Sequence, residues 1–193
     1  MSALQSAPAK FFIQMSGAPG SGKSTLAKLI RPSIGGVIID HDVLRSSLLE
    51  ADLVPFDEAA RQAYILQWNL AHDIIKQGLN IIVDSTCNYP EILAQGSNLA
   101  SEHNYVYWYV ECKTGDINLL DQRLRNRDSM TSQRTAVDCP PAAARDARVG
   151  EDPRALFHKW IENPCRPERN TIIVDSTCDP EMLRDQILKQ IVG

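Results

Sequence analysis

The sequence has few of the features that mark secreted or membrane proteins. Its five cysteines are scattered, odd in number and without a C-x-x-C pair, which argues against a disulfide framework or a zinc site. No apolar run approaches the length of a membrane span, and residues 1–10 lack the apolar core of a signal peptide. The formal net charge is −4, so long nucleic acid tracts are not an expected partner. We therefore expect a cytoplasmic protein with reduced thiols.

A complete phosphate-binding loop is the most specific motif present. The pattern G-x-x-x-x-G-K-[ST] is formed by Gly17, Ala18, Pro19, Gly20, Ser21, Gly22, Lys23 and Ser24, followed by Thr25. Residues 10–16 predict a strand before it, and residues 24–30 predict a helix after it, which is the context that the loop requires. Backbone N–H groups in such a loop surround phosphate oxygens at a helix N-terminus. We expect a bound nucleoside triphosphate, with Lys23 at the β- and γ-phosphates and Ser24 on Mg²⁺.

Strands and helices alternate along the rest of the chain. Besides the strand before the loop, strands are predicted at 36–40, 80–84, 105–111 and 171–175. Helices are predicted at 41–50, 55–77, 90–102, 116–127 and 180–191, and the helix after the loop is expected to stop at Pro32. Short, nearly all-apolar strands separated by helices indicate a parallel sheet covered on both faces. The 193 residues suit a single α/β domain spanning 1–193.

Residues 128–154 fit this alternation least well, because they are polar, marked by prolines and only weakly periodic. Long connections inside a compact α/β domain are often functional, and lids are drawn from such segments. We predict a lid at about 126–154, and the alternative is a disordered surface loop.

One heptapeptide occurs twice, at 81–87 and at 172–178, and each copy is a strand that ends in Asp-Ser-Thr-Cys. Each copy is followed shortly by Pro-Glu, but nothing else around the two copies matches well, so we interpret the identity as local convergence rather than as a repeat. The aspartates Asp84 and Asp175 should then have different roles, because their strands occupy different places in the sheet.

Acidic residues end two of the predicted strands. Asp40 ends the strand at 36–40, with Asp42 and Arg45 close behind, and Asp84 ends the strand at 80–84. Ligands collect at the carboxyl ends of parallel strands, so these residues should share one rim with the loop. We expect Asp42 to be the base for an acceptor hydroxyl and Arg45 to hold the acceptor. The alternative is that Asp42 only caps the next helix and Arg45 lies on a solvated face.

Metal and arginine sites complete the predicted rim. Asp84 should organise Mg²⁺ together with Ser24, and Asp40 could share that task. Arg123 and Arg127 lie four residues apart on a predicted helix that leads into the lid, so they should face the same way. Two guanidinium groups placed there can neutralise charge on a transferring phosphoryl group.

These motifs together resemble the P-loop kinases with a nucleoside monophosphate kinase-like fold. Within them the chain is most similar to the group of 5′-polynucleotide kinases and small ATP-binding kinases. The resemblance implies the strand order 2-3-1-4-5, Asp42 as general base, Arg45 at the acceptor, and Arg123 and Arg127 as lid arginines. The spacing of Asp40, Asp42 and Arg45 also occurs in adenylylsulfate kinases, and paired aspartates occur in shikimate and gluconate kinases. The motif therefore does not identify the acceptor.

The absence of motifs from other nucleotide-binding classes indicates the phosphoryl donor, and the acceptor is considered after it. A GTPase would carry D-x-x-G and N-K-x-D, which this sequence lacks, so ATP is the expected donor, with adenine near 175–180. Arg61, Tyr64 and Trp68 could guide a polynucleotide end, but such an aromatic stripe is more typical of a core. We therefore expect a small metabolite or nucleoside-like acceptor, and keep a 5′-hydroxyl polynucleotide kinase and a non-catalytic ATP-binding switch as alternatives.

Overall fold

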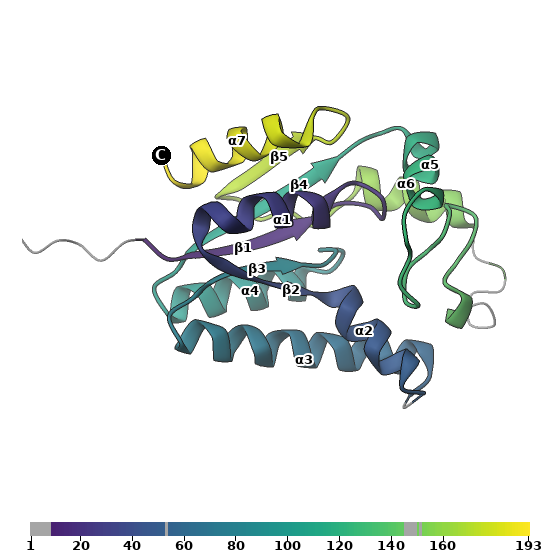
Figure 1. Cartoon of the computed structure of the whole chain (residues 1–193), viewed down its shortest axis with the longest axis horizontal. Coiled ribbons are helices and arrows are strands. Elements are labelled where there is room, and N and C mark those ends of the chain that lie inside the picture. Colours follow the sequence, from purple (N-terminus) through teal and green to yellow (C-terminus); the bar gives the residue numbers. More distant parts are fainter. Residues whose placement is uncertain (1–8, 53, 145–149, 151) are drawn as a thin grey trace, which may run out of the picture.

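A five-stranded parallel sheet forms the centre of the molecule (Figure 1). The computed structural model describes residues 9–52, 54–144, 150 and 152–193. The strands are β1 (Phe11–Ser16), β2 (Gly36–Asp40), β3 (Asn80–Asp84), β4 (Val106–Lys113) and β5 (Thr171–Asp175). Their order in the sheet is β2-β3-β1-β4-β5, which confirms the predicted 2-3-1-4-5 topology.

Helices cover both faces of this sheet, so the three-layer α/β architecture is confirmed as well. Helices α1 (Lys23–Ile34) and α7 (Pro180–Ile191) lie on one face, and α3 (Phe56–Lys76) and α4 (Pro90–Glu102) lie on the other (Figure 1). Successive residues of β1 point to opposite sides of a sheet. Accordingly, Ile13 and Met15 pack with α1 and α7, whereas Phe12 packs with α3 and α4.

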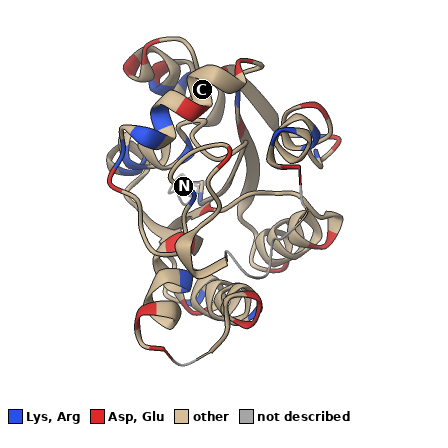
Figure 2. Cartoon of the chain, turned by 90° about the vertical axis from the view of Figure 1, so that its right-hand side faces the viewer, with Lys and Arg blue, Asp and Glu red and all other residues tan. Residues whose placement is uncertain are grey.

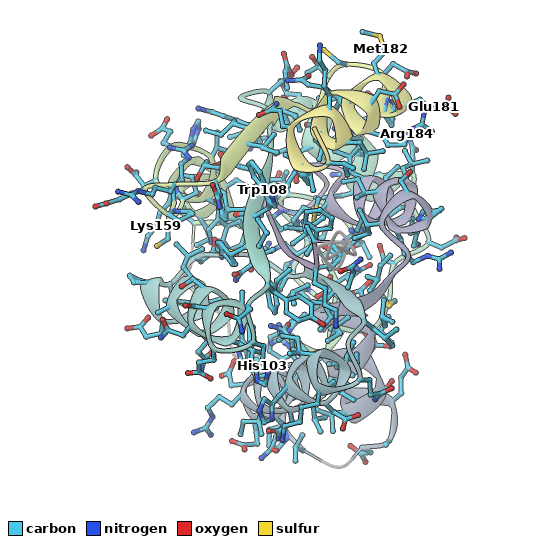
Figure 3. All side chains as sticks on the ribbon, turned by 90° about the vertical axis from the view of Figure 1, so that its left-hand side faces the viewer. His103, Trp108, Lys159, Glu181, Met182 and Arg184 are labelled. Atoms are coloured by element: carbon cyan, nitrogen blue, oxygen red, sulfur yellow. The ribbon has the colours of Figure 1, made fainter. Side chains whose placement is uncertain are left out.

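Three further helices, α2 (His41–Glu50), α5 (Ile117–Arg125) and α6 (Pro153–Glu162), lie beyond the carboxyl ends of the strands (Figure 1). Helix α7 has one face that packs on the sheet and one that is exposed. Leu183 and Ile187 are buried in the core, whereas Glu181, Met182 and Arg184 point away from the sheet (Figure 3). Among the described residues, no helix combines the length and the apolar character needed to cross a membrane.

Helix α1 does not stop at Pro32, as the sequence suggested, but continues to Ile34. A proline removes the hydrogen bond to the carbonyl four residues before it, and here that loss falls in the last turn of the helix. Continuing the helix buries Ile34 in the same cluster as Ile30, which offsets the lost bond. The helix ends instead at Gly35, whose φ of 64° is the left-handed conformation of a C-cap.

Helix α6 was not predicted, and α5 is shorter than predicted. Asp152 caps α6 by accepting hydrogen bonds from the N–H groups of Arg154 and Ala155, and Phe157 packs against α5. Helix α5 ends at Arg125, two residues before the predicted end. The predicted lid at 126–154 therefore overlaps the start of α6, and its residues 145–149 and 151 lie outside the described part of the chain.

Candidate active site

The phosphate-binding loop connects β1 to α1, in the strand–loop–helix arrangement that the sequence predicts. Gly17 has a φ of +133°, and a Cβ atom there would lie 2.3 Å from the carbonyl oxygen of Cys112 on the neighbouring strand. Lys23 Nζ donates to the carbonyl oxygens of Gly17 at 3.0 Å and Ala18 at 3.1 Å. The ammonium group is thus held over the loop, where the phosphates of a nucleotide would lie.

Asp84 lies at the carboxyl end of β3, directly beside Asp40 at the end of β2. Its side chain is buried, and its Oδ2 atom has no hydrogen-bond partner among the described residues. Burial raises the pKa of Asp84, as does the nearby Asp42 carboxylate, while Lys23 and a hydrogen bond from Ser24 lower it. A buried acceptor without a partner, next to the loop serine, fits the coordination of a cation.

Asp40 has two neighbouring acids and a structural task. Its Oδ1 accepts hydrogen bonds from the backbone N–H groups of Asp42 at 2.9 Å and Val43 at 3.4 Å, so Asp40 is the N-cap of α2. The alternative interpretation that Asp42 caps this helix is therefore wrong. Burial, with the carboxylates of Asp84 and Asp42 close by, raises the pKa of Asp40 to about 6.

No group of three or more histidine, cysteine or acidic side chains could hold a metal ion by itself within the described residues. Magnesium is usually held by one or two carboxylates together with water and substrate phosphates, rather than by a cage of protein ligands. Ser24, Asp84 and Asp40 fit that mode, because the loop serine and the two carboxylates at the strand ends line the cavities at the loop and would leave the remaining positions to the nucleotide.

Asp42 lines a cavity of about 370 Å³, which we call the acceptor pocket. Its walls include Lys23, Asp84 and Tyr64. Asp42 Oδ2 accepts a hydrogen bond from Nε2 of Gln133 at 2.7 Å. The adjacent His41 is buried with its ring 4.1 Å from that of Tyr64, and burial lowers the pKa of His41 to about 4.

Arg45 also lines the acceptor pocket rather than a fully solvated face. Its guanidinium lies 3.9 Å from the centre of the Phe56 ring, and Nη2 donates to the Phe56 carbonyl oxygen at 3.2 Å. These contacts fix the plane of the guanidinium at one end of α3. The structure thus brings Arg45 and Asp42 to the same cavity, as the sequence predicts.

A second cavity of about 480 Å³, which we call the nucleotide pocket, is lined by the loop, by the start of α1 and by the segment after β5. Arg123 and Arg127 both line it, although Arg127 lies beyond the end of α5 rather than on the helix. Arg123 Nη2 donates to the carbonyl oxygen of Ser176 at 2.6 Å, and Arg127 Nη2 donates to that of Arg134 at 3.0 Å. Burial lowers the pKa of Arg127, whereas the charges of Asp42 and Asp40 raise it.

The two pockets meet at one edge of the loop. Five residues line both of them: Gly20, Gly22, Ser24, Arg127 and Gln133. Figure 2 looks onto this end of the molecule and shows basic and acidic segments interspersed around it. The junction is therefore the place where a group bound in one pocket could reach a group bound in the other.

The remaining sequence-predicted residues divide between the pockets and the core. Tyr64 lines the acceptor pocket, whereas Trp68 packs among core residues. Arg61 is exposed, pairs with Glu58 and lines neither pocket. Both aromatic residues pack against the buried cluster of Cys87, Ile92 and Tyr109, so the core interpretation of the stripe holds, and Tyr64 in addition lines the acceptor pocket.

The two copies of the repeated heptapeptide lie in different surroundings. Asp84 is buried beside the phosphate-binding loop, while Asp175 is exposed and accepts hydrogen bonds from the backbone N–H and the hydroxyl of Thr177. Strand β3 lies between β2 and β1, whereas β5 forms the edge of the sheet. The different environments expected for the two aspartates are thus present.

Several pocket residues were missed by the sequence analysis. Helix α6 contributes Leu156, Lys159 and Trp160 to the acceptor pocket, and its C-cap residue Asn163 adds a fourth, at the i, i+3, i+4, i+7 spacing of one helix face. That spacing, after an Asp-Pro start, was a readable signal. Gln133 and Ser132 had no such signal, because their contacts with α2 join positions about ninety residues apart.

The strand order and the phosphate-binding loop are shared with solved structures of small P-loop kinases, and this likeness shows the fold of the chain. The family model described as "AAA domain" matches residues 12–148, and the chain belongs to this family. No curated protein matches the sequence.

Solved structures share the fold at low sequence identity. A protein from Chloroflexus aurantiacus j-10-fl, named as a kinase only provisionally, is 17% identical with a TM-score of 0.69, covering 95% of this chain and 96% of that one. The APS kinase of Mycobacterium tuberculosis, solved with AMPPNP and APS, is 17% identical with a TM-score of 0.63 and coverages of 97% and 100%. A gluconokinase from Sinorhizobium meliloti 1021 is 15% identical with a TM-score of 0.54 and coverages of 94% and 90%.

Proposed function

We propose that the protein is a kinase that transfers the γ-phosphoryl group of Mg-ATP to a hydroxyl group of an acceptor. The observation that carries this proposal is the junction of two pockets at the phosphate-binding loop, with Asp42 on the acceptor side and Arg123 on the nucleotide side. A switch module that only binds ATP would need the nucleotide pocket, but it would need neither the Asp42 carboxylate nor an acceptor pocket.

The nucleotide would be held by the loop and by the segment after β5. Lys23 would exchange its contacts with the loop carbonyls for the β- and γ-phosphates, and adenine would lie near Arg123, Ser176 and Pro180. Ser24, Asp84 and Asp40 would hold Mg²⁺. When bound, that ion neutralises charge on the phosphates.

The transfer itself would use residues at the junction. Asp42 would accept the proton of the acceptor hydroxyl. The hydroxyl oxygen would then bond to the γ-phosphorus, while the bond between that phosphorus and the ADP oxygen breaks. Arg45 would hold the acceptor in the pocket that it lines with Asp42. Arg127, which reaches both pockets, and Arg123 would stabilise the charge of the transferring group.

A small metabolite or nucleoside-like molecule is the acceptor class that we favour. The acceptor pocket has a volume of about 370 Å³, within the range of small-molecule sites. A polynucleotide end would need a basic track leading to Asp42, but the net charge is −4 and both signs are interspersed at this end (Figure 2). Small-molecule kinases among the fold neighbours, such as gluconokinase, are consistent with this choice.

Two substitutions test the roles of the loop and the base. Lys23→Ala should abolish ATP binding or turnover, because the ammonium that meets the phosphates is lost. Asp42→Asn should keep ATP binding and lose phosphoryl transfer, because an amide does not accept the proton. The measurements are ATP affinity by calorimetry and radiolabelled transfer from γ-³²P-ATP. Asp73→Asn is the matched control, since Asp73 also accepts a 2.7 Å hydrogen bond from a glutamine but is exposed on α3.

The acceptor panel should contain sugars, nucleosides and 5′-hydroxyl oligonucleotides. Transfer to an alcohol that disappears in Asp42→Asn supports the proposal, and full transfer in that variant contradicts the assignment of the base. Tight ATP binding without transfer to any acceptor favours the switch module. Micromolar binding of the oligonucleotide with a steep salt dependence would favour the polynucleotide kinase.

A further inference from the structure

Gln133 lies where the two pockets meet, on a turn formed by residues 129–134. It is the only residue of that turn whose side chain bonds the Asp42 carboxylate among the described hydrogen bonds. Its position is therefore next to the proposed base and next to the space through which a phosphoryl group would pass.

The orientation of the Gln133 amide follows from its two partners. Oε1 accepts a hydrogen bond from the backbone N–H of Met130 at 3.2 Å, and Nε2 donates to Asp42 Oδ2 at 2.7 Å. A flipped amide would place its NH₂ group against a donor and its oxygen against a carboxylate, so both contacts would become repulsive. The amide thus presents a donor to the base in the one orientation that both partners favour.

The 129–134 turn is itself fastened to α2, the helix that carries Asp42. Ser132 donates from its backbone N–H to Ser46 Oγ at 3.1 Å, and the two hydroxyl oxygens lie 2.9 Å apart. Ser132 Oγ also donates to the Asp42 carbonyl oxygen at 3.2 Å, and both serines are buried. Buried hydrogen bonds of this kind define one docked arrangement, because breaking them leaves polar groups without partners.

The charges around Asp42 show why its carboxylate needs a fixed orientation. Asp40 from β2, Asp84 from β3, Arg127 from the segment after α5 and the adjacent His41 all lie within electrostatic reach of it. Two acids repel the carboxylate and a guanidinium attracts it, so without Gln133 it could turn toward Arg127 or toward a bound cation.

We propose that Gln133 is a positioning residue for phosphoryl transfer, and this inference rests on the proposed kinase function. Gln133 holds Oδ2 of Asp42, and among the described hydrogen bonds Oδ1 accepts none. In this proposal Oδ1 takes the proton of the acceptor hydroxyl, and Gln133 acts through Asp42 by holding Oδ2. Geometric errors of about 1 Å cost about a hundredfold in rate, which sets the scale of the effect.

The test compares three variants by steady-state kinetics of Mg-ATP turnover, with water and with the best alcohol of the acceptor panel. Gln133→Ala should lower kcat about tenfold to a hundredfold and leave the KM for ATP within about threefold. Gln133→Glu keeps the shape but removes the donor, so it should not restore kcat. The matched control is Gln77→Ala, which removes an equally short 2.7 Å bond to Asp73 on the exposed surface of the protein and should leave kcat unchanged.

The possible outcomes separate this inference from the proposed function. If wild-type protein turns over ATP and Gln133→Ala has the kcat of Gln77→Ala, the positioning role is overturned and the kinase remains. Restoration of kcat by Gln133→Glu would also overturn it, because shape rather than the donor would then matter. If kcat is unchanged and only the melting temperature falls, Gln133 has a structural role alone. Absence of turnover with every acceptor in wild-type protein overturns the kinase proposal and this inference with it.

Discussion

Replacing Asp40 by asparagine should stabilise the metal-free protein at neutral pH. Burial beside two other carboxylates raises the pKa of Asp40 from 3.8 to about 6, so the folded state favours its neutral form. The stability contributed by the neutral Asp40 carboxyl group is fully present below pH 4 and is lost as the pH rises through 6. A shift of about two pKa units corresponds to about 3 kcal/mol at most. Asparagine stays neutral at every pH and still caps α2.

The measurement is the free energy of unfolding in urea at pH 4 and pH 7.5, without magnesium or nucleotide. The free energy of unfolding of Asp40→Asn should exceed that of the wild type by about 1–3 kcal/mol at pH 7.5, and the two values should be close at pH 4. The depressed pKa of His41 makes both proteins less stable as the pH falls from 6.5 to 4, and it largely cancels in the difference.

Asp116→Asn is the matched control, because Asp116 caps α5 with the same pair of backbone hydrogen bonds but is exposed. Its effect should stay within about 0.5 kcal/mol at both pH values, since asparagine and aspartate cap helices about equally well. A stability of Asp40→Asn no greater than that of the wild type at pH 7.5, or an equal gain at both pH values, would refute the reasoning.

Two more substitutions probe the frame of the site. Gly17→Ala forces a Cβ atom to 2.3 Å from the Cys112 carbonyl oxygen at a φ of +133°, and should cost about 2 kcal/mol or more in thermal unfolding; an unchanged melting temperature would contradict this. Arg166→Ala removes the bidentate partner of the buried Glu111 and should lower the free energy of unfolding by about 2 kcal/mol. This is less than the loss of a fully buried pair, because Arg166 is partly exposed. Arg184→Ala, which breaks a surface pair with Asp185, should change stability far less.

The sheet was predictable because its signals are local. Each of the strands at 36–40, 80–84 and 171–175 is a short apolar run that ends in an aspartate, and the structure places all three at the predicted bounds. The stop at Pro32 was wrong for a reason that is not local. Whether a proline ends a helix depends on what the next turn buries, and Ile34 finds a place in the core.

The candidate site was predictable only in part. The loop, Asp40 and Asp84 follow from motif and strand ends, and the fold brings them together at one rim. The sequence offered Asp42 as a possible helix cap, but the backbone geometry gives that task to Asp40. Gln133 and Ser132 reach α2 only because the 129–134 turn docks there, and no pattern in the chain encodes a contact of that range.

The repeated heptapeptide has a consequence for chemical labelling. Cys87 and Cys178 end identical sequences, yet Cys87 is fully buried while Cys178 is exposed on the wall of the nucleotide pocket. A mild thiol-directed electrophile should therefore modify Cys178 and spare Cys87. Bound ATP should protect Cys178 from this modification. An ATP-like molecule that carries such an electrophile could be tethered there, which gives covalent ligand design a fixed point beside the proposed adenine position.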